Sequence, residues 1–292
     1  MQRCMIDYWR PAEALLPYVM SYSRFHVGDD PGVFVTEPFF GPYVSLRITT
    51  GRRGWSFAVG NRRYPQVPPI AVFGTNSRLG FGSTDGETAF GAGLSPRGWA
   101  RFAQTDAAFF ADQVTATERL GAFELHGLAA SLRAGADVPA TMNAFFLAAL
   151  AGSQPEPAVV AILEQLLADP AVRTVHELAE RSGLTAVQLG RIVPRHFGFT
   201  PKRLMRRRRF MAVLMRARAL PRGHWAEAIE DSDYFDQAHF LRDCQSFLGM
   251  PLGRFLALQT PMSDESLRKR AAVRDASMQP PQVAADAPRV AA

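Results

Sequence analysis

The chain has 292 residues, of which 47% are hydrophobic and 21% are charged. This length exceeds a single typical core and suits two domains followed by a tail. The composition is that of a globular protein, and no apolar run approaches the roughly 18 residues of a membrane span, which excludes a membrane partner. The N-terminus also lacks the apolar segment of a secretion signal, so we expect a cytoplasmic location.

Two cysteines, Cys4 and Cys244, exclude a disulfide framework and a zinc finger and fit a reducing compartment. The expected β-rich region holds one histidine, His26, with His126 beyond it, and its glutamates are scattered. A metal-dependent enzyme needs clustered ligands, and no nucleophile motif or phosphate-binding glycine loop is present. The sequence therefore predicts no enzyme activity, no metal and no cofactor.

The net charge of +6 is unevenly distributed along the chain. Residues 1–156 carry 13 Arg against 13 Asp and Glu, whereas residues 157–258 carry 15 Lys and Arg against 10. Residues 259–292 hold 5 against 4. The excess is expected of a surface that binds phosphates. An ordinary solubility charge is an equally good reading of the charge alone.

Residues 1–151 predict a β-rich, barrel-like domain with trailing helices, in the position of a sensor or assembly domain. Apolar and polar residues alternate in several short runs, which is typical of half-buried strands. Gly and Pro clusters separate the runs. From Trp99 to about Leu150 the sequence is Ala-rich and mostly helical. The alternating apolar residues are Val44, Leu46, Ile48, Trp55, Phe57, Val59, Phe90, Ala92 and Leu94.

Residues 152–157 are short, polar and proline-bearing, and they predict a linker. The helical spacing of apolar residues that follows predicts an all-α domain over 158–258. From Gln259 onward large apolar residues thin out, so residues 259–292 are predicted to be a disordered tail. The expected fold class is therefore α+β.

The segment 174–201 predicts a first helix-turn-helix unit. Thr174 with Glu177 has the spacing of a capping box, in which two side chains satisfy the free amides at a helix start. Gly183 suits the left-handed residue that ends a helix. A second capping box, Thr185 with Gln188, follows at once and begins the next helix. That helix leaves Gln188, Arg191 and Arg195 toward solvent or DNA.

The segment 224–251 predicts a second unit. Trp225, Ala228 and Ile229 supply the apolar side of its first helix. Asp236 is a good N-cap for the next helix, and Gly249 ends it. Gln237, His239 and Arg242 face outward on this second helix. Between the units, residues 201–220 predict one helix of roughly 27–30 Å, comparable to the roughly 34 Å between successive major-groove faces.

The segment 157–258 resembles the AraC/XylS family of bacterial transcription regulators. The resemblance implies two recognition helices that enter adjacent major grooves, and an N-terminal domain that binds an effector, dimerises, or both. The matching residues are Leu178, Ala179, Gly183, Leu184, Thr185, Leu189, Arg191, Gly198, Phe199, Thr200, Pro201, Arg209, Phe210, Tyr234, Asp236, Gln237, Ala238, His239, Phe240, Arg242, Phe247, Gly249, Met250 and Pro251.

Three positions depart from the family pattern. Pro194 lies inside the first recognition helix, where proline removes a hydrogen bond, so we expect the helix to kink or end early. Asp233 stands where glycine is usual, and we expect a small cost because Asp tolerates left-handed backbone. Ala228 replaces a larger apolar residue, which makes that core thinner.

The sequence thus predicts a sequence-specific DNA-binding transcription regulator. Its expected partners are double-stranded DNA, a small-molecule effector, RNA polymerase and a second copy of the chain. The alternative is a protein-interaction module whose degenerate helix-turn-helix pair has lost specific DNA binding. Four consecutive arginines, 206–209, point in four directions on a helix, so not all can reach phosphate. The candidate DNA-binding residues are Thr185, Gln188, Arg191, Arg195, Gln237, His239 and Arg242, with Thr185 and Asp236 acting mainly as caps.

Overall fold

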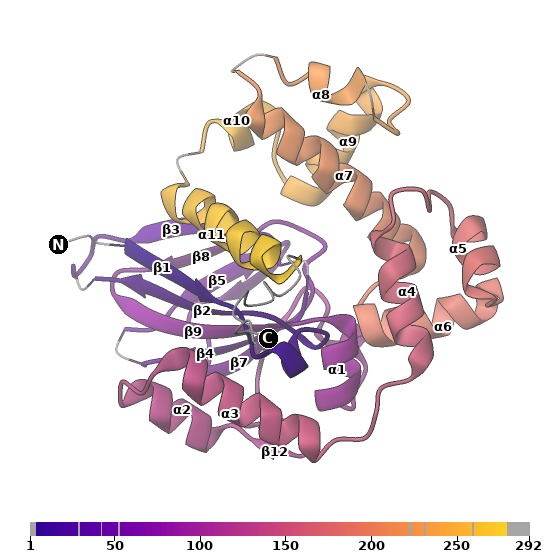
Figure 1. The fold of residues 1–292 in the computed structure, drawn as a ribbon. Coiled ribbons are helices and arrows are strands. Elements are labelled where there is room, and N and C mark those ends of the chain that lie inside the picture. The colour runs from indigo at the N-terminus through magenta and orange to yellow at the C-terminus, as the bar shows by residue number, and fades with distance from the viewer. Residues whose placement is uncertain are drawn as a thin grey trace, which may run out of the picture.

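Two antiparallel sheets form the N-terminal half of the chain, and helices form most of the rest (Figure 1). The computed structural model describes residues 4–28, 30–41, 43–51, 53–221, 224–230, 232–258 and 260–278. The larger sheet has the order β1 (Cys4–Trp9), β2 (Val19–Val27), β9 (Glu87–Leu94), β4 (Ser45–Thr49), β7 (Ile70–Phe73) and β10 (Val114–Ala116). The smaller sheet has the order β3 (Val35–Phe39), β8 (Gly80–Thr84), β5 (Ser56–Val59) and β6 (Arg62–Tyr64).

The α+β fold class is confirmed, with one difference in its β part. Each sheet keeps two separate edge strands in the part of the chain that the structure describes, so the strands form two open sheets and no closed barrel. A further hairpin, β11 (Arg119–Leu120) with β12 (Phe123–Glu124), interrupts the region expected to be mostly helical.

The alternation of apolar and polar residues over 44–49 corresponds to strand β4. It pairs with β9 and β7 on either side, with Ile48 opposite both Phe90 and Ile70. Leu46 and Ile48 belong to the main hydrophobic core under the helices. Arg47, on the opposite face, lies over the rings of Phe39 and Phe73. Both faces of the strand are therefore covered, one by helices and the other by the smaller sheet.

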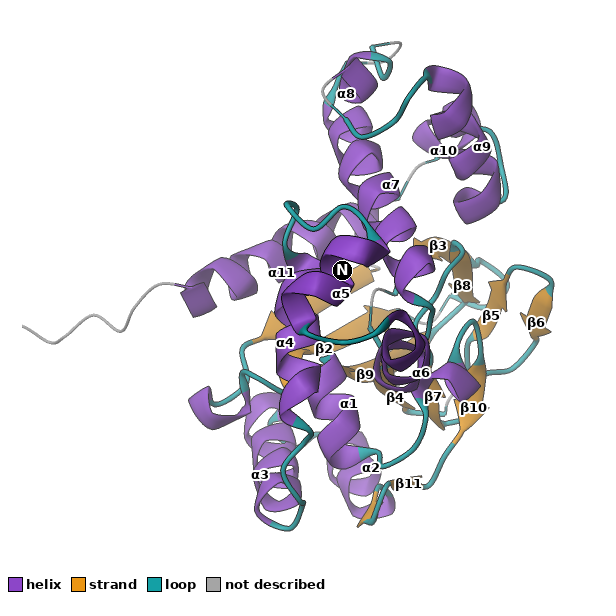
Figure 2. Cartoon of the chain, turned by 90° about the vertical axis from the view of Figure 1, so that its right-hand side faces the viewer, coloured by secondary structure: helices purple, strands orange, loops and turns teal. Residues whose placement is uncertain are grey.

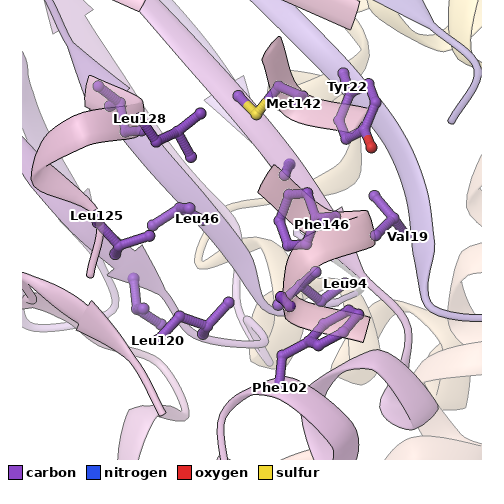
Figure 3. Packing of buried hydrophobic residues seen from close by; sticks show 14 of the residues in the cluster. Val19, Tyr22, Leu46, Leu94, Phe102, Leu120, Leu125, Leu128, Met142 and Phe146 are labelled. Carbon is purple, nitrogen blue, oxygen red and sulfur yellow. The ribbon is translucent and has the colours of Figure 1, made fainter. Parts of the chain in front are cut away.

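Helices cover one face of the larger sheet. They are η1 (Glu13–Leu15), α1 (Pro96–Phe102), η2 (Ala107–Phe110), α2 (His126–Arg133) and α3 (Val138–Ala151). Tyr22 from β2 stacks on Phe146 from α3, and Phe102 from α1 packs beside Phe146 (Figure 3). A Cβ at Gly98 would lie 2.0 Å from the Tyr18 carbonyl oxygen, so only glycine lets α1 approach the segment after η1 this closely.

The C-terminal half contains α4 (Ala158–Ala168), α5 (Val175–Ser182), α6 (Ala186–Phe197), α7 (Pro201–Ala219), α8 (Glu227–Glu230), α9 (Gln237–Leu248) and α10 (Leu252–Leu256). Two separate cores hold these helices. Met205 near the start of α7 joins the core of α4, α5 and α6, whereas Phe210 and Leu214 join that of α8, α9 and α10. Helix α7 therefore connects the two parts through its own buried side chains.

The segment predicted as a linker is held against the N-terminal helices. Glu156 has a side chain only 7% exposed and forms ion pairs with Arg97 at 2.7 Å and Arg101 at 3.3 Å. Arg97 lies in the first turn of α1, and its guanidinium group is directed toward Glu156 by this ion pair. The connection between the two halves is therefore anchored by charge as well as by packing.

Glu164 on α4 gives this region an expected pH dependence. Burial raises its pKa to about 7, and the negative charge of Glu156 acts in the same direction against the attraction of Arg97. An unfolded glutamate releases its proton near 4.5, so the folded chain binds more protons between about pH 4.5 and 7. Stability contributed by Glu164 therefore falls as the pH rises through that window.

Replacing Glu164 with glutamine removes this titration. The free energy of unfolding of Glu164→Gln should match wild type near pH 5 and exceed it near pH 8, as measured by urea denaturation at both values. Glu13→Gln, at an exposed position of η1, is the control and should leave the pH dependence unchanged. The same pH slope in Glu164→Gln as in wild type would contradict the assignment.

The predicted disordered tail differs from the structure over residues 261–278, which form α11 (Pro261–Met278). The helix lies across the strands of the N-terminal half (Figure 1). The Glu37 carboxylate accepts hydrogen bonds from the amides of Met262 and Ser263 at its start, at 3.2 and 3.1 Å. Tyr8 bonds Ser266 at 2.8 Å further along. The rest of the predicted tail, 279–292, lies outside the described residues.

Among the helices that the structure describes, none combines the length and the hydrophobicity that a membrane span requires.

Candidate nucleic-acid interface

The first helix pair, α5 and α6, begins at the two predicted capping boxes. Thr174 accepts from the Glu177 amide at 3.1 Å, and Glu177 accepts from the Thr174 amide at 3.2 Å. Thr185 and Gln188 repeat this exchange at 3.2 and 2.8 Å. Gly183, with φ of 68°, ends α5 as predicted. In the second box the carboxamide oxygen of Gln188 is already hydrogen-bonded within the cap, so it is not available to accept a hydrogen bond from a ligand.

Pro194 does not end α6, contrary to expectation. The helix continues to Phe197, and the Gly198 amide donates to the Pro194 carbonyl at 2.9 Å. A proline ring crowds the carbonyl four residues earlier, which here belongs to Gly190, the residue with the greatest backbone freedom. Arg195 therefore keeps a helical position, where it forms an ion pair with Asp106 at 3.2 Å. That pair directs Arg195 toward the N-terminal domain.

The second helix pair, α8 and α9, is less regular. Helix α8 is a single turn, Glu227–Glu230. Helix α9 begins at the predicted cap, where Asp236 accepts from the His239 amide at 2.5 Å, and ends at Gly249 with φ of 70°. The His239 ring packs edge-on against Tyr234 at 4.9 Å between centroids. This contact makes His239 partly buried, so its ring helps to pack the turn before α9 and is also partly accessible at the surface.

Asp233 behaves differently from the expectation of a left-handed turn residue. Gln104 and Asp112 are the non-glycine residues with positive φ in the described chain, so Asp233 is not left-handed. Its carboxylate instead pairs with Arg173 at 3.2 Å, which joins the loop before α5 to the turn before α9. Ala228 is buried in the core of α8 and α9.

The four consecutive arginines of α7 bind three different parts of the protein. Arg206 donates to Asp243 of α9 at 2.9 Å, and Arg209 lies 4.7 Å over the Tyr234 ring. Arg208 donates to the carbonyls of Leu167 and Asp169 at the C-terminal end of α4, at 2.8 and 2.6 Å.

Arg207 turns to the N-terminal domain, 4.8 Å over the ring of Phe40, and burial lowers its pKa to about 10. Together the four guanidinium groups hold both helix pairs and the N-terminal domain on α7. These contacts within the protein account for the four consecutive arginines, and no contact to phosphate is needed to explain them.

The helices that follow the two turns, α6 and α9, are not parallel. Figure 2 looks nearly along the axis of α6, whereas α9 runs across the same view. One full turn of B-DNA is a translation along its axis, so two helices docked alike in successive major grooves would be parallel. Each of these helices also contacts the N-terminal domain. Arg195 of α6 pairs with Asp106, and the Leu79 amide donates to the Phe247 carbonyl of α9 at 2.7 Å.

The predicted DNA-binding residues divide into two groups. Arg191 and Arg242 are exposed, and neither guanidinium forms an ion pair or hydrogen bond with any residue that the structure describes. Gln237 is exposed at the start of α9 in the same way. The second group consists of residues whose side chains already contact other residues of the chain: Thr185, Gln188, Arg195 and His239.

Two apolar residues at the helix starts were not predicted from the sequence. Val187 in the first turn of α6 is 84% exposed, and Phe235 just before the Asp236 cap is 93% exposed. Apolar side chains at such positions can contact the methyl group of thymine. The sequence could have indicated them, because each lies within two residues of an N-cap, where a side chain points away from the core.

No group of three or more His, Cys, Asp or Glu side chains suitable for a metal ion occurs among the described residues. The fold and these surfaces define a protein with an N-terminal two-sheet domain and a helical domain that presents two capped helix pairs on a connecting helix.

Comparisons with known proteins give a distant likeness to solved structures. A structure of ToxT from Vibrio cholerae at 1.65 Å resolution matches with 11% identity and a TM-score of 0.43, over 80% of this chain and 97% of that one. ToxT from Vibrio cholerae O395 matches with 10% identity and a TM-score of 0.40, over 88% and 98%. An apo single-substitution variant of ToxT from Vibrio cholerae strain SCE256 matches with 8% identity and a TM-score of 0.43, over 88% and 97%. No protein-family model and no curated protein matches the chain.

Proposed function

We propose that the chain is a sequence-specific DNA-binding transcription regulator whose two helix pairs act as helix-turn-helix units. The observation that carries this proposal is the pair of unengaged, exposed arginines, Arg191 and Arg242, one on each helix that follows a turn. Arginine is the side chain best suited to read guanine and to pair with phosphate. The resemblance of 157–258 to AraC/XylS regulators supports the same function.

The N-terminal domain regulates DNA binding in this proposal. Its contacts to α6 and α9 hold the two helices in directions that do not match successive major grooves. A ligand or a second copy of the chain that weakens these contacts would free the helices to become parallel. A homodimer, contact with RNA polymerase and a cytoplasmic location belong to the proposal and rest on the resemblance and the sequence.

The test is a titration of the full chain against DNA from upstream of its own gene, at about 50 and 200 mM salt, with scrambled DNA of equal length as control. We expect the upstream DNA to bind at least about 10³-fold more tightly than the scrambled DNA. Affinity should fall steeply with salt, by about 10³-fold or more if six or more phosphates are contacted.

A second candidate function is a protein-interaction module in which the helix pairs no longer read DNA. The single-turn helix α8 and the non-parallel directions of α6 and α9 favour it. Equal affinity for upstream and scrambled DNA, or no binding at about 50 mM salt, would favour this module over the regulator.

A further inference from the structure

Helix α11 connects the second helix pair to the N-terminal domain from its C-terminal side. Helix α10 ends at Leu256 and α11 begins at Pro261, so only a short segment separates the two helices. From there α11 runs back across the strands of the N-terminal half (Figure 1). It therefore adds a connection to the hydrogen bond that already joins Leu79 to Phe247 of α9.

The first turn of α11 is held by Glu37 of β3. The Glu37 carboxylate accepts from the Met262 amide at 3.2 Å, and from the Ser263 amide and hydroxyl at 3.1 and 2.7 Å. The first amides of a helix have no acceptor within the helix, and the helix dipole favours a negative charge at that end. Arg218 of α7 pairs with Asp264 in the same turn. The start of α11 is thus a junction of β3, α7 and α11.

The next turns of α11 contact β1 through polar groups. The Tyr8 hydroxyl bonds the Ser266 hydroxyl at 2.8 Å and accepts from Arg270 at 3.0 Å. Lys269 donates to the Ile6 carbonyl at 2.5 Å. Hydrogen bonds of this kind replace hydrogen bonds to water, so each contributes little net stability to the docked helix.

Little apolar packing holds α11 in place. Met262 is buried, but none of the hydrophobic clusters formed by the described residues includes it or any other residue of α11. Leu267 remains 38% exposed. A surface helix is normally held by an apolar stripe, whereas this one presents Ser266, Lys269 and Arg270 to β1. Release of α11 therefore breaks up no hydrophobic cluster.

A like charge near Arg270 also favours release. Burial lowers the pKa of Arg47 on β4 to about 10, while Tyr8 opposes this shift and the positive charge of Arg270 adds to it. The two guanidinium groups are thus close enough to repel each other, and the repulsion ends when α11 leaves.

We propose that α11 is a detachable strap that, when docked on β1 and β3, holds the second helix pair against the N-terminal domain. The Glu37 cap defines the docked position, and the polar contacts to β1 make the docking reversible. Detachment of α11 leaves α9 held by fewer contacts and lets it move. The regulatory consequence rests on the proposed function: α9 carries Arg242, so a docked strap limits DNA binding and a released strap favours it.

The test measures the release of α11 in the full chain without DNA. Trypsin cleaves after Lys and Arg, and cleavage at residues 268–270 requires α11 to detach and unfold locally, so its rate follows the detached population. Hydrogen exchange of the Leu79 amide, which donates to Phe247, measures separately whether the second helix pair loosens. Mass spectrometry reads both rates.

Two variants weaken the strap at different points. Tyr8→Phe keeps the ring and removes the hydroxyl that bonds α11, whereas Glu37→Ala removes the cap. Each should increase cleavage at 268–270 and exchange at Leu79 by about 5-fold, the effect of a lost cap or hydrogen bond. Thr36→Ala, at the exposed neighbouring position of β3, is the matched control and should behave as wild type.

Unchanged cleavage in both variants, or faster cleavage with unchanged exchange at Leu79, would overturn the proposal. An equal gain in Thr36→Ala would assign the effect to the sheet and would overturn it too. In a titration with upstream DNA, both variants should bind about 5-fold more tightly than wild type, and unchanged affinity would overturn the regulatory role. Faster cleavage and exchange in a chain that binds no DNA would support the strap and overturn only the regulator.

Discussion

Replacing Asp243 with alanine is expected to lower the free energy of unfolding by about 3 kcal/mol, since breaking a buried ion pair costs about 3–5 kcal/mol and one partner here is partly exposed. The Asp243 side chain is 1% exposed, whereas that of Arg206 is 43% exposed. The carboxylate accepts from Arg206 at 2.9 Å and from the Tyr234 hydroxyl at 2.7 Å. Its removal leaves Tyr234, which is also buried, without an acceptor.

Urea denaturation of Asp243→Ala and wild type measures this loss. Asp233→Ala is the matched control, because its ion pair with Arg173 is exposed on both sides and should contribute about 0–1 kcal/mol. Asp243→Asn keeps an oxygen for the Tyr234 hydroxyl and should fall between the two. A loss in Asp243→Ala no greater than that in Asp233→Ala would show that Asp243 does not hold the second helix pair to α7.

Local signals in the sequence predicted the helix boundaries well, because a cap is formed by residues only three positions apart. Thr174 with Glu177 and Thr185 with Gln188 form the predicted boxes, and Asp236 forms the predicted cap. Strand β4 was predictable for the same reason, since its alternation has a period of two. These features depend on neighbours along the chain and not on the rest of the fold.

Features that depend on distant partners were not predictable. The composition of residues 261–278 suggested disorder, yet Glu37 caps the start of α11, and no sequence pattern connects residues so far apart. Helices α6 and α9 likewise contact Asp106 and Leu79 in the other domain, which are distant in the sequence.

The positive charge of 157–258 was also a weaker signal for DNA than its size suggested. Several of its arginines bind the protein itself, including Arg203, which reaches Ser77 and Asp112, and the four arginines 206–209. In the proposed function, an arginine that reads DNA must lack a partner within the protein, and only the structure reveals that lack. Arg191 and Arg242 meet that criterion.

Replacing Arg191 and Arg242 together with alanine is expected to weaken binding to the upstream DNA by about 30-fold to 10⁴-fold. Each contact to a base contributes about 1–3 kcal/mol, and the residues lie on different helices, so their effects should add. Affinity for scrambled DNA should fall much less, because it depends on phosphate contacts alone. Anisotropy titrations of the single and double variants on both DNAs measure the two effects.

The control must remove the same charge from a place that cannot reach DNA through either helix. Arg62→Ala, at an exposed position of β6, meets this requirement and should change the affinity less than about 2-fold, because exposed charges beyond a Debye length are screened. A loss in Arg242→Ala alone would mean that only α9 reads bases and that α6 stays docked on Asp106. A loss shared equally by Arg62→Ala would reduce the effect to net charge, and neither helix pair would then be a reader of sequence.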